Sequence, residues 1–348
     1  MIVGNNGLPT DPYALAKAAA TAILERFDVA ALDVAFVLGS GWSAAADDLG
    51  RPIGSCELAE LPGFTRPTVV GHGGALRIAS TPSDKIAAVF TGRTHLYEGH
   101  GPDRVVHGVR TAIAAGAGTI VLTNGCGGID PERPPGSTVL IRDHINLTGS
   151  TPLLGTRFID LSVAYSARLR DLARTVDPDL PEGVYVQFRG PQFETPAEVR
   201  MAGLLGGDLV GMSTTLETIA ARELGAEVLG ISLITNLAAG ISAEPLSHEE
   251  VLVTGQQAAP RLRQLLSGIA AALLHRARRG YPATSRAPSP AGCHKIRISK
   301  PGSTSMIFWA QRRRETPAHL PNSWTRSRGD SSSAPLGCAA HLVPARIG

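Results

Sequence analysis

Short apolar runs recur along the chain, and helix-forming segments separate most of them. Short apolar runs of this kind are typical of strands that are buried in a sheet. We expect strands near residues 34–38, 86–90, 119–123, 138–142, 184–188, 208–212 and 228–235. We expect helices near residues 103–115, 162–175, 196–205, 214–224 and 248–276, after a first helix that Asp11-Pro12 opens. This alternation predicts an α/β fold, a single domain with a central mixed, largely parallel sheet flanked by helices.

Charge divides the chain into two parts. Residues 281–348 hold 10 Lys and Arg against 2 Asp and Glu, whereas residues 1–280 hold 23 against 28. The C-terminal part is rich in Pro and Ser and keeps no helical or strand period, so we expect a disordered tail at 281–348 after a folded catalytic domain at 1–280. A basic tail can contact phosphates, but its Arg/Pro/Ala/Gly bias fits a read-through or out-of-frame extension better than a nucleic-acid site.

Several classes of protein are disfavoured by composition. The apolar runs reach only about eight residues, too short to cross a membrane. The N-terminus lacks the basic-then-apolar pattern of a secretory signal, which favours the cytoplasm. The four cysteines show no C-x-x-C spacing, so we interpret them as free thiols. We expect a soluble cytoplasmic enzyme with neither a metal ion nor an organic cofactor.

Three short segments follow strands between residues 190 and 240. The first carries an aromatic ring and a carboxylate, Phe193 and Glu194, just before a helix that Thr195 caps. The second is Gly211-Met212-Ser213-Thr214, and the third is Thr235-Asn236. A ring that stacks, a carboxylate that accepts and an amide that donates, all at strand ends, are suited to holding a flat heterocycle by its face and its edge.

Further motifs precede these three in the chain. They are Gly39-Ser40-Gly41, Gly71-His72-Gly73-Gly74, the segment Gly92 to His100, Thr123-Asn124-Gly125-Cys126-Gly127-Gly128, and Asp143-His144-Ile145-Asn146-Leu147. Together, over roughly residues 10–276, the eight ordered motifs resemble the trimeric, 6-oxopurine-specific class of purine nucleoside phosphorylases. The resemblance implies the nucleoside phosphorylase fold and a homotrimer. It also implies phosphorolysis of inosine, guanosine and their deoxy forms to a free purine and (deoxy)ribose 1-phosphate, in which inorganic phosphate is a co-substrate.

The phosphate site is supported by the residues themselves as well as by the resemblance. Ser40 lies in a glycine-flanked turn whose amides can form an anion nest. Arg93 offers a fork of donors, and His95 lies on the same side of an extended segment. The resemblance implies that phosphate is bound by Ser40, His72, Arg93, His95, the backbone amide of Gly125, and Ser213, with His72 gating the site from a mobile loop.

The resemblance also assigns the sugar and base contacts. Tyr97, His248 and Met212 are expected against ribose, and Phe158 is expected to complete the pocket of a neighbouring subunit. The base is expected to contact Cys126, Phe193, Glu194 and Asn236. Glu194 would accept from N1–H, and Asn236 would donate to N7 and O6 as negative charge builds there. The expected catalytic residues are Asn236, Glu194, His95 and Ser40.

A departure from the family pattern lies beside the expected base site, and three other functions remain open. Gly125-Cys126 stands where the family usually has Ala followed by Ala or Ser, which loosens the loop and puts a larger atom beside the base. A methylthioadenosine phosphorylase shares the fold, but an Asp would be expected in place of Asn236. A nucleosidase that uses water would have little need for the phosphate residues. A catalytically impaired protein that binds nucleosides or polyanions is the alternative from another class.

Overall fold

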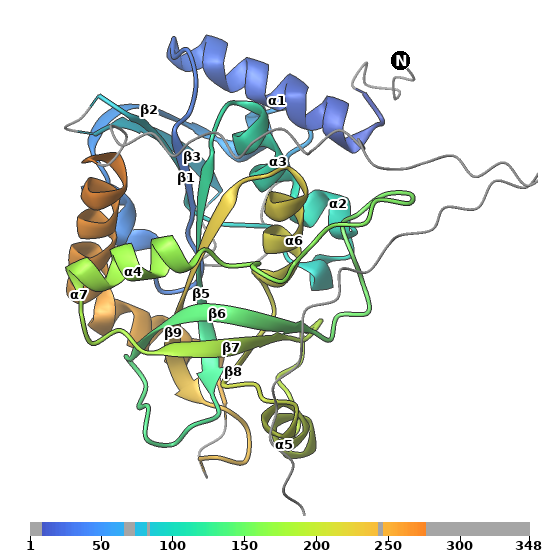
Figure 1. The fold of residues 1–348 in the computed structure, drawn as a ribbon, viewed down its shortest axis with the longest axis vertical. Coiled ribbons are helices and arrows are strands. Elements are labelled where there is room, and N and C mark those ends of the chain that lie inside the picture. The colour runs from blue at the N-terminus through green and yellow to red at the C-terminus, as the bar shows by residue number, and fades with distance from the viewer. Residues whose placement is uncertain (1–8, 66–73, 82–83, 243–245, 276–348) are drawn as a thin grey trace, which may run out of the picture. The chain divides into compact units, whose positions relative to one another are not determined.

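The computed structural model describes residues 9–65, 74–81, 84–242 and 246–275. These residues belong to one of the two units of the chain, Met1–Gly280. The tail expected at 281–348 lies outside the described residues. A mixed sheet runs through the described unit, with helices on both of its faces (Figure 1).

The sheet contains nine strands among the described residues, in the order β2-β3-β4-β1-β5-β8-β7-β6-β9. Their bounds are β1 Val34–Val37, β2 Arg51–Glu57, β3 Ala75–Ser80, β4 Ile86–Phe90, β5 Thr119–Gly128, β6 Thr138–Asn146, β7 Glu182–Gln187, β8 Leu209–Gly211 and β9 Glu227–Leu237. β5 also pairs with β9, so β5, β8, β7, β6 and β9 form a closed ring of strands. β1, β4, β3 and β2 extend from β5 as an open sheet.

Strand directions agree with the expected mixed sheet. Five described pairings are parallel and four are antiparallel. The α/β fold with a mixed, largely parallel sheet is therefore confirmed. In β1, Ala35 and Val37 face one apolar cluster while Val34 and Phe36 face the other, because alternate side chains of a strand point to opposite faces. Both faces of this strand are thus core.

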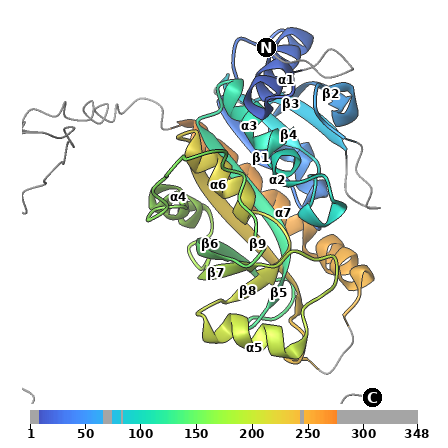
Figure 2. The same ribbon diagram turned by 90° about the vertical axis from the view of Figure 1, so that its right-hand side faces the viewer.

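Different helices cover the two faces of the sheet. The α-helices are α1 Pro12–Phe27, α2 Pro102–Val105, α3 His107–Ala114, α4 Ala167–Val176, α5 Pro196–Leu204, α6 Thr215–Glu223 and α7 His248–His275, and the 3-10 helices are η1 Ser43–Asp48, η2 Leu58–Glu60 and η3 Leu96–Glu98. Side chains of α1, α3 and α6 pack in one cluster, and those of α4 and α7 in the other. α1 and α3 lie near the open sheet, whereas α5 lies at the opposite end, beside β8 (Figures 1 and 2).

Two strands were not expected from the sequence. β2 and β3 pair antiparallel at the open edge of the sheet. β2 begins Arg51-Pro52 and contains Gly54, residues that weaken a strand signal but are tolerated at an edge. Other expected bounds also shift: β5 continues to Gly128, so the expected loop after residue 123 is strand, and the helix expected from residue 162 begins at Ala167.

Candidate active site

A pocket of about 320 Å³ opens where β5, β8 and β9 end. It is lined by segments far apart in the chain, and most predicted site residues meet there. The predicted residues on its wall are Ser40, His95, Tyr97, Gly125, Cys126, Phe193, Glu194, Met212, Ser213 and Asn236. Arg93 and Phe158 are not on this wall. His72 and the side chain of His248 lie outside the described part of the chain.

The turn that carries Ser40 is fixed against the end of β5. The Gly39 amide donates to Thr123 Oγ1 at 3.1 Å, and a Cβ at Gly39 would lie 2.6 Å from the Thr123 carbonyl oxygen, so only glycine fits. The buried indole of Trp42 donates from Nε1 to the Asn124 carbonyl oxygen at 2.9 Å. The Ser40 turn is therefore held at both ends.

Helix α7 also packs against this turn. A Cβ at Gly255 would lie 2.4 Å from Gly41 Cα, so the backbones of α7 and the turn touch directly. Gly41 has φ +83°, a left-handed conformation that glycine adopts without strain. This contact brings the first turns of α7 to the pocket, where Val251 contributes to the wall.

Arg93 lies behind Ser213 and is buried. Its Nη1 donates to Ser213 Oγ at 3.1 Å and lies 3.2 Å from the Glu217 carboxylate. Its Nη2 donates to the carbonyl oxygens of Val37 at 2.9 Å and Thr123 at 2.5 Å. A buried arginine paired with a carboxylate and carbonyls is a rigid cation. It supplies positive charge one hydrogen bond away from the pocket wall.

The residue after Ser213 adopts an unusual backbone conformation. Thr214 has φ +78°, a region that costs a non-glycine residue on the order of 1–3 kcal/mol. Its amide donates to Glu217 Oε2 at 3.1 Å, and its Oγ1 accepts from Asn124 Nδ2 at 2.9 Å and from Arg93. These bonds hold the strained turn and, with it, the position of Ser213 at the start of α6.

His95 and Tyr97 form one stacked side of the pocket. Their ring centroids lie 4.9 Å apart with an interplanar angle of 14°. The His95 amide donates to Glu98 Oε1 at 2.6 Å, which fixes the backbone where η3 begins. Burial raises the pKa of Tyr97 to about 12, so its hydroxyl stays protonated at neutral pH and can both donate and accept.

Glu194 is a buried carboxyl group at the pocket. Its residue is 7% exposed, and its Oε1 accepts no hydrogen bond from any described residue. Burial raises the pKa of Glu194. The expected capping box is present directly after it, because Thr195 and Glu198 exchange side-chain to backbone hydrogen bonds of 2.7 and 3.2 Å. A buried acceptor without a partner needs a donor, and a bound ligand can supply one.

Asn236 ends β9 with its amide held from both sides. Its Oδ1 accepts from Thr235 Oγ1 at 2.9 Å, and its Nδ2 donates to the Leu237 carbonyl oxygen at 3.1 Å. Thr235 Oγ1 also lies 3.2 Å from the Cys126 carbonyl oxygen. Because the amide nitrogen carries two N–H groups, one of them can still donate to a ligand.

Gly125 and Cys126 occupy a crowded strand. A Cβ at Gly125 would lie 3.1 Å from Thr235 Cγ2 and 3.4 Å from the Ser40 carbonyl oxygen, so the site is close to full even without a side chain. The thiol of Cys126 is buried, donates to the Leu233 carbonyl oxygen at 3.4 Å, and has its pKa raised to about 12 by burial. Cys126 is therefore a neutral wall atom and a poor nucleophile.

Glu217 and Asn124 support the site but were missed as functional residues. Asn124 directly precedes Gly125 and Cys126, which were predicted as site residues, and it also lines the pocket. A helix-capping role for Glu217 could have been predicted from the sequence, because Thr214-Thr215-Leu216-Glu217 has the spacing of a capping box. The pairing of Glu217 with Arg93 across 124 positions of sequence had no such signal.

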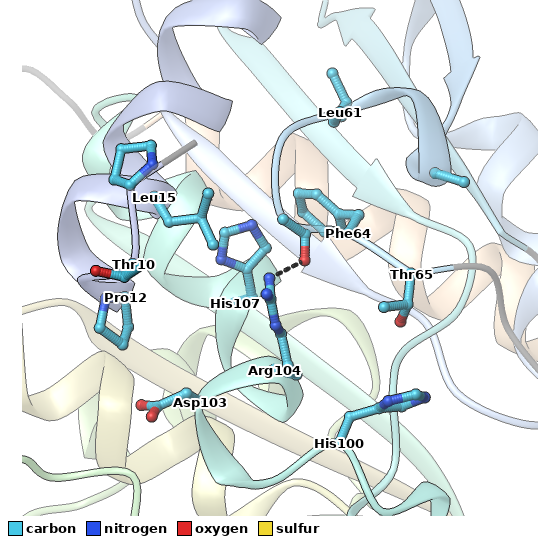
Figure 3. A pocket seen from close by; sticks show the side chains of 13 residues that line it. Thr10, Pro12, Leu15, Leu61, Phe64, Thr65, His100, Asp103, Arg104 and His107 are labelled. Atoms are coloured by element: carbon cyan, nitrogen blue, oxygen red, sulfur yellow. Dashed lines mark hydrogen bonds between the residues drawn. The ribbon is translucent and has the colours of Figure 1, made fainter. Parts of the chain in front are cut away.

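A second cavity of about 610 Å³ lies between the start of α1, residues 61–65 and the α2–α3 region (Figure 3). His107 Nε2 is 2.9 Å from the Pro62 carbonyl oxygen, and Arg104 donates to the Gly63 carbonyl oxygen, the bond dashed in Figure 3. Burial lowers the pKa of His107 to about 4, so its ring is neutral. Among the described residues, no predicted site residue lines this cavity.

The described residues hold no cluster of three or more His, Cys, Asp or Glu arranged for a metal ion. No helix among them combines the length and apolar character needed to cross a membrane.

Comparisons with known proteins agree with one another. A family model described as the phosphorylase superfamily matches residues 33–271. The chain is 57% identical over 265 residues to a purine nucleoside phosphorylase of Cellulomonas sp., covering 75% of this chain and 94% of the relative. It is 54% identical over 261 residues to one of Mycobacterium tuberculosis, covering 75% and 97%.

A solved structure shows the same fold. It is isoform 2 of purine nucleoside phosphorylase from Schistosoma mansoni in complex with cytosine and ribose-1-phosphate. The TM-score is 0.68 at 31% sequence identity, and the match covers 75% of this chain and 98% of the other.

Proposed function

The chain belongs to the phosphorylase superfamily, and we propose that it cleaves 6-oxopurine nucleosides with inorganic phosphate. The observation that carries this proposal is the presence, in one pocket, of a buried carboxyl whose Oε1 has no hydrogen-bond partner among the described residues and a carboxamide whose oxygen is already engaged. Glu194 Oε1 can accept from a ligand, and Asn236 Nδ2 has a second N–H that can donate to one. A 6-oxopurine offers the N1–H donor and the O6 and N7 acceptors that satisfy both.

The phosphate is held by the groups around the Ser40 turn. Ser40, His95, the Gly125 amide and Ser213 provide hydrogen bonds, and Arg93 places its charge directly behind Ser213 Oγ. The Glu217 carboxylate, 3.2 Å from the same guanidinium, offsets much of that charge, so Arg93 acts on the phosphate mainly by holding the Ser213 hydroxyl in place. His72 joins this set as the sixth phosphate residue.

The proposed reaction uses these groups in a single displacement at C1′. A phosphate oxygen forms a bond to C1′ while the C1′–N9 bond breaks, and the bonding electron pair moves into the purine. The Asn236 amide donates to N7 and O6 as that charge grows, so it binds the transition state more tightly than the substrate. The purine takes up a proton, in balance with the proton that hydrogen phosphate loses when its oxygen bonds to C1′, and leaves as the neutral base, and the sugar leaves as ribose 1-phosphate.

Tyr97, Met212 and His248 are assigned to the sugar. The described part of this subsite depends on Gly190, which has φ +70° and whose added Cβ would lie 2.4 Å from Met212 Sδ. Gly190 thus lets the Pro191 to Glu194 segment approach Met212 closely. Phe193 and Cys126 complete the wall around the base.

The active assembly is a homotrimer in which Phe158 of one subunit completes the pocket of the next. Phe158 is 95% exposed, an unusual state for an aromatic side chain in a folded unit. We assign the enzyme to purine salvage in the cytoplasm, with no organic cofactor and no metal ion.

A phosphate-dependence assay tests this proposal. Base release from inosine, guanosine, adenosine and methylthioadenosine is measured with and without phosphate, using the full chain and a variant ending at residue 280. Fast release from inosine and guanosine only with phosphate is expected. Preference for methylthioadenosine would indicate the related phosphorylase, phosphate-independent release a nucleosidase, and guanine binding without turnover an impaired binding protein.

A further inference from the structure

We propose that Arg157 is a positioning residue that holds Phe158 ready for the pocket of a neighbouring subunit. This inference rests on the proposed function, because it explains how one chain presents a residue to another. Between β6 and α4 the chain makes a long excursion without helix or strand (Figure 1). Phe158 lies within it, on a segment that several independent contacts fix.

Arg157 is tied to a buried carboxylate. Its Nη1 lies 2.9 Å from Oε1 of Glu223, whose side chain is only 2% exposed. Its guanidinium also lies 4.6 Å from the centre of the Tyr13 ring, which is cation–π distance. Tyr13 in turn donates its hydroxyl to the same Glu223 oxygen at 2.6 Å. The residue before Phe158 is therefore anchored to both α1 and α6.

The start of the excursion is anchored by a second arginine. Arg110 is 1% exposed, and its Nη2 donates to the Pro152 carbonyl oxygen at 2.6 Å. Its Nη1 pairs with Asp103 at 2.7 Å, and its guanidinium lies 4.5 Å from the centre of the Tyr13 ring. Arg110 Nη2 also lies 3.8 Å from Glu223, so this carboxylate keeps a cation even without Arg157. Loss of Arg157 should thus loosen the segment next to Phe158 without leaving a buried charge alone.

The residues after Phe158 are fixed as well. Ile159 and Leu161 pack on the apolar cluster that includes Leu96, the residue between His95 and Tyr97. Asp160 accepts from the Ser162 amide at 2.8 Å and from its hydroxyl at 2.6 Å. Phe158 is exposed between two anchored neighbours, so its exposure is a property of the folded loop. An aromatic ring presented in this way fits a protein surface, and a second copy of this chain supplies one in the proposed trimer.

The test compares three variants by steady-state kinetics with inosine. Phe158→Ala measures the value of the ring. Arg157→Met removes the anchor but keeps an unbranched apolar chain. Arg261→Met is the matched control, because Arg261 is 55% exposed against 53% for Arg157 and also makes one ion pair, with Asp177. We expect Arg157→Met and Phe158→Ala to raise KM for inosine and to lower kcat/KM by about ten- to a hundredfold, and Arg261→Met to behave as wild type.

A mixing experiment separates positioning in a neighbour from an effect within one chain. Subunits carrying Glu194→Ala have a damaged base site but an intact loop, and Arg157→Met subunits have the reverse. In a co-expressed mixture of equal amounts, roughly a quarter of the sites in a ring combine an intact base site with an intact neighbouring loop. Activity well above either parent is therefore expected, whereas no recovery would overturn the inference.

The outcomes distinguish the inference from the function on which it rests. If Phe158→Ala is impaired and Arg157→Met is not, the anchor is overturned while the trimeric site survives. If Phe158→Ala has wild-type kinetics, both the shared pocket and the anchor are overturned. Should Arg157→Met be poorly folded, the double variant Arg157→Met/Glu223→Gln removes both charges, and its KM should still be raised. Arg157→Lys should recover part of the activity, because the ion pair can re-form without the planar stacking.

Discussion

Thr235 Oγ1 lies 2.9 Å from Asn236 Oδ1, so the hydroxyl of one residue fixes the orientation of the amide of the next. A carboxamide can present either its oxygen or its nitrogen, and this hydrogen bond, together with the one from Nδ2 to the Leu237 carbonyl oxygen, assigns the two ends of the amide. The second N–H of the nitrogen then remains for the ligand. The pair therefore favours a base with acceptors at positions 6 and 7 over one with a 6-amino donor.

Asn236→Asp should reverse this preference. An ionised Asp donates no hydrogen bond, repels the charge that grows on a 6-oxopurine, and accepts from a 6-amine. Loss of a buried edge contact costs a few kcal/mol, so kcat/KM for inosine should fall by about a hundredfold or more and the ratio to adenosine should shift toward adenosine. The measurement is kcat/KM for both nucleosides on both proteins. An unchanged ratio would show that Asn236 does not read position 6.

Thr235→Val is the isosteric companion to that variant. It keeps the volume of the side chain but removes the hydroxyl that orients the amide, so the Asn236 nitrogen loses its assigned direction. A smaller effect, about tenfold in kcat/KM for inosine, is expected from a single lost neutral hydrogen bond. Wild-type selectivity in this variant would mean that the Asn236 orientation is fixed by other contacts.

Glu194→Ala should lower turnover of inosine and guanosine by orders of magnitude and leave the fold intact, since it removes a group without a protein partner at Oε1. Glu194→Gln isolates the charge. Because burial raises the pKa of Glu194, wild-type kcat/KM should fall on the acid side at a pH above the usual carboxyl range, and the glutamine variant should lose that limb. Kinetics across pH on the three proteins provide the check. Wild-type rates in Glu194→Ala would show that Glu194 does not bind the base.

His107 should make the folded state sensitive to acid. Its pKa is lowered to about 4, whereas in the unfolded chain it is near the ordinary histidine value of 6.5, so between these values the unfolded chain binds a proton that the folded chain does not. The free energy of unfolding should therefore drop as pH falls through this window, by up to roughly 3 kcal/mol from this residue. Urea unfolding at pH 7 and pH 4 compares wild type with His107→Gln. The variant should lose less stability on acidification, and parallel losses would contradict the assignment.

Removal of residues 281–348 should preserve activity and thermal stability, because that segment has too little patterned apolar surface to add to a core. Limited proteolysis should cut there before it cuts the domain. The checks are kcat/KM for inosine and the melting temperature of the two proteins. A melting temperature several degrees lower after truncation would show that the tail docks on the domain.

The sequence predicted the parts of the site that local signals encode. Gly39, the Thr195 capping box and the strand ends around Ser213 and Asn236 each follow from a short pattern. Long-range pairings could not be found in this way, as in the contact between Arg93 and Glu217. The positive φ of Thr214 could not be predicted from the sequence either, because threonine is not typical of that backbone conformation. The hydrogen bonds that hold it come from Asn124, Arg93 and Glu217, of which the first two are distant in the sequence.

The fold shows the same division. Alternating strands and helices predicted the α/β class, and the strands of the central sheet were found where apolar runs stood. The edge strand β2 was missed because Pro52 and Gly54 interrupt its pattern, while edge position tolerates both. The closure of β5 onto β9 depends on pairing across more than a hundred residues, which periodicity does not report.

In the proposed reaction a phosphate oxygen, and not water, attacks C1′ of a purine nucleoside. The most direct measurement uses inosine with ¹⁸O-labelled phosphate and mass spectrometry of the sugar product. We expect ribose 1-phosphate that retains the label in the oxygen bonded to C1′, together with hypoxanthine in equal amount and no reaction without phosphate. Free ribose whose C1′ oxygen comes from water, formed at the same rate without phosphate, would contradict it.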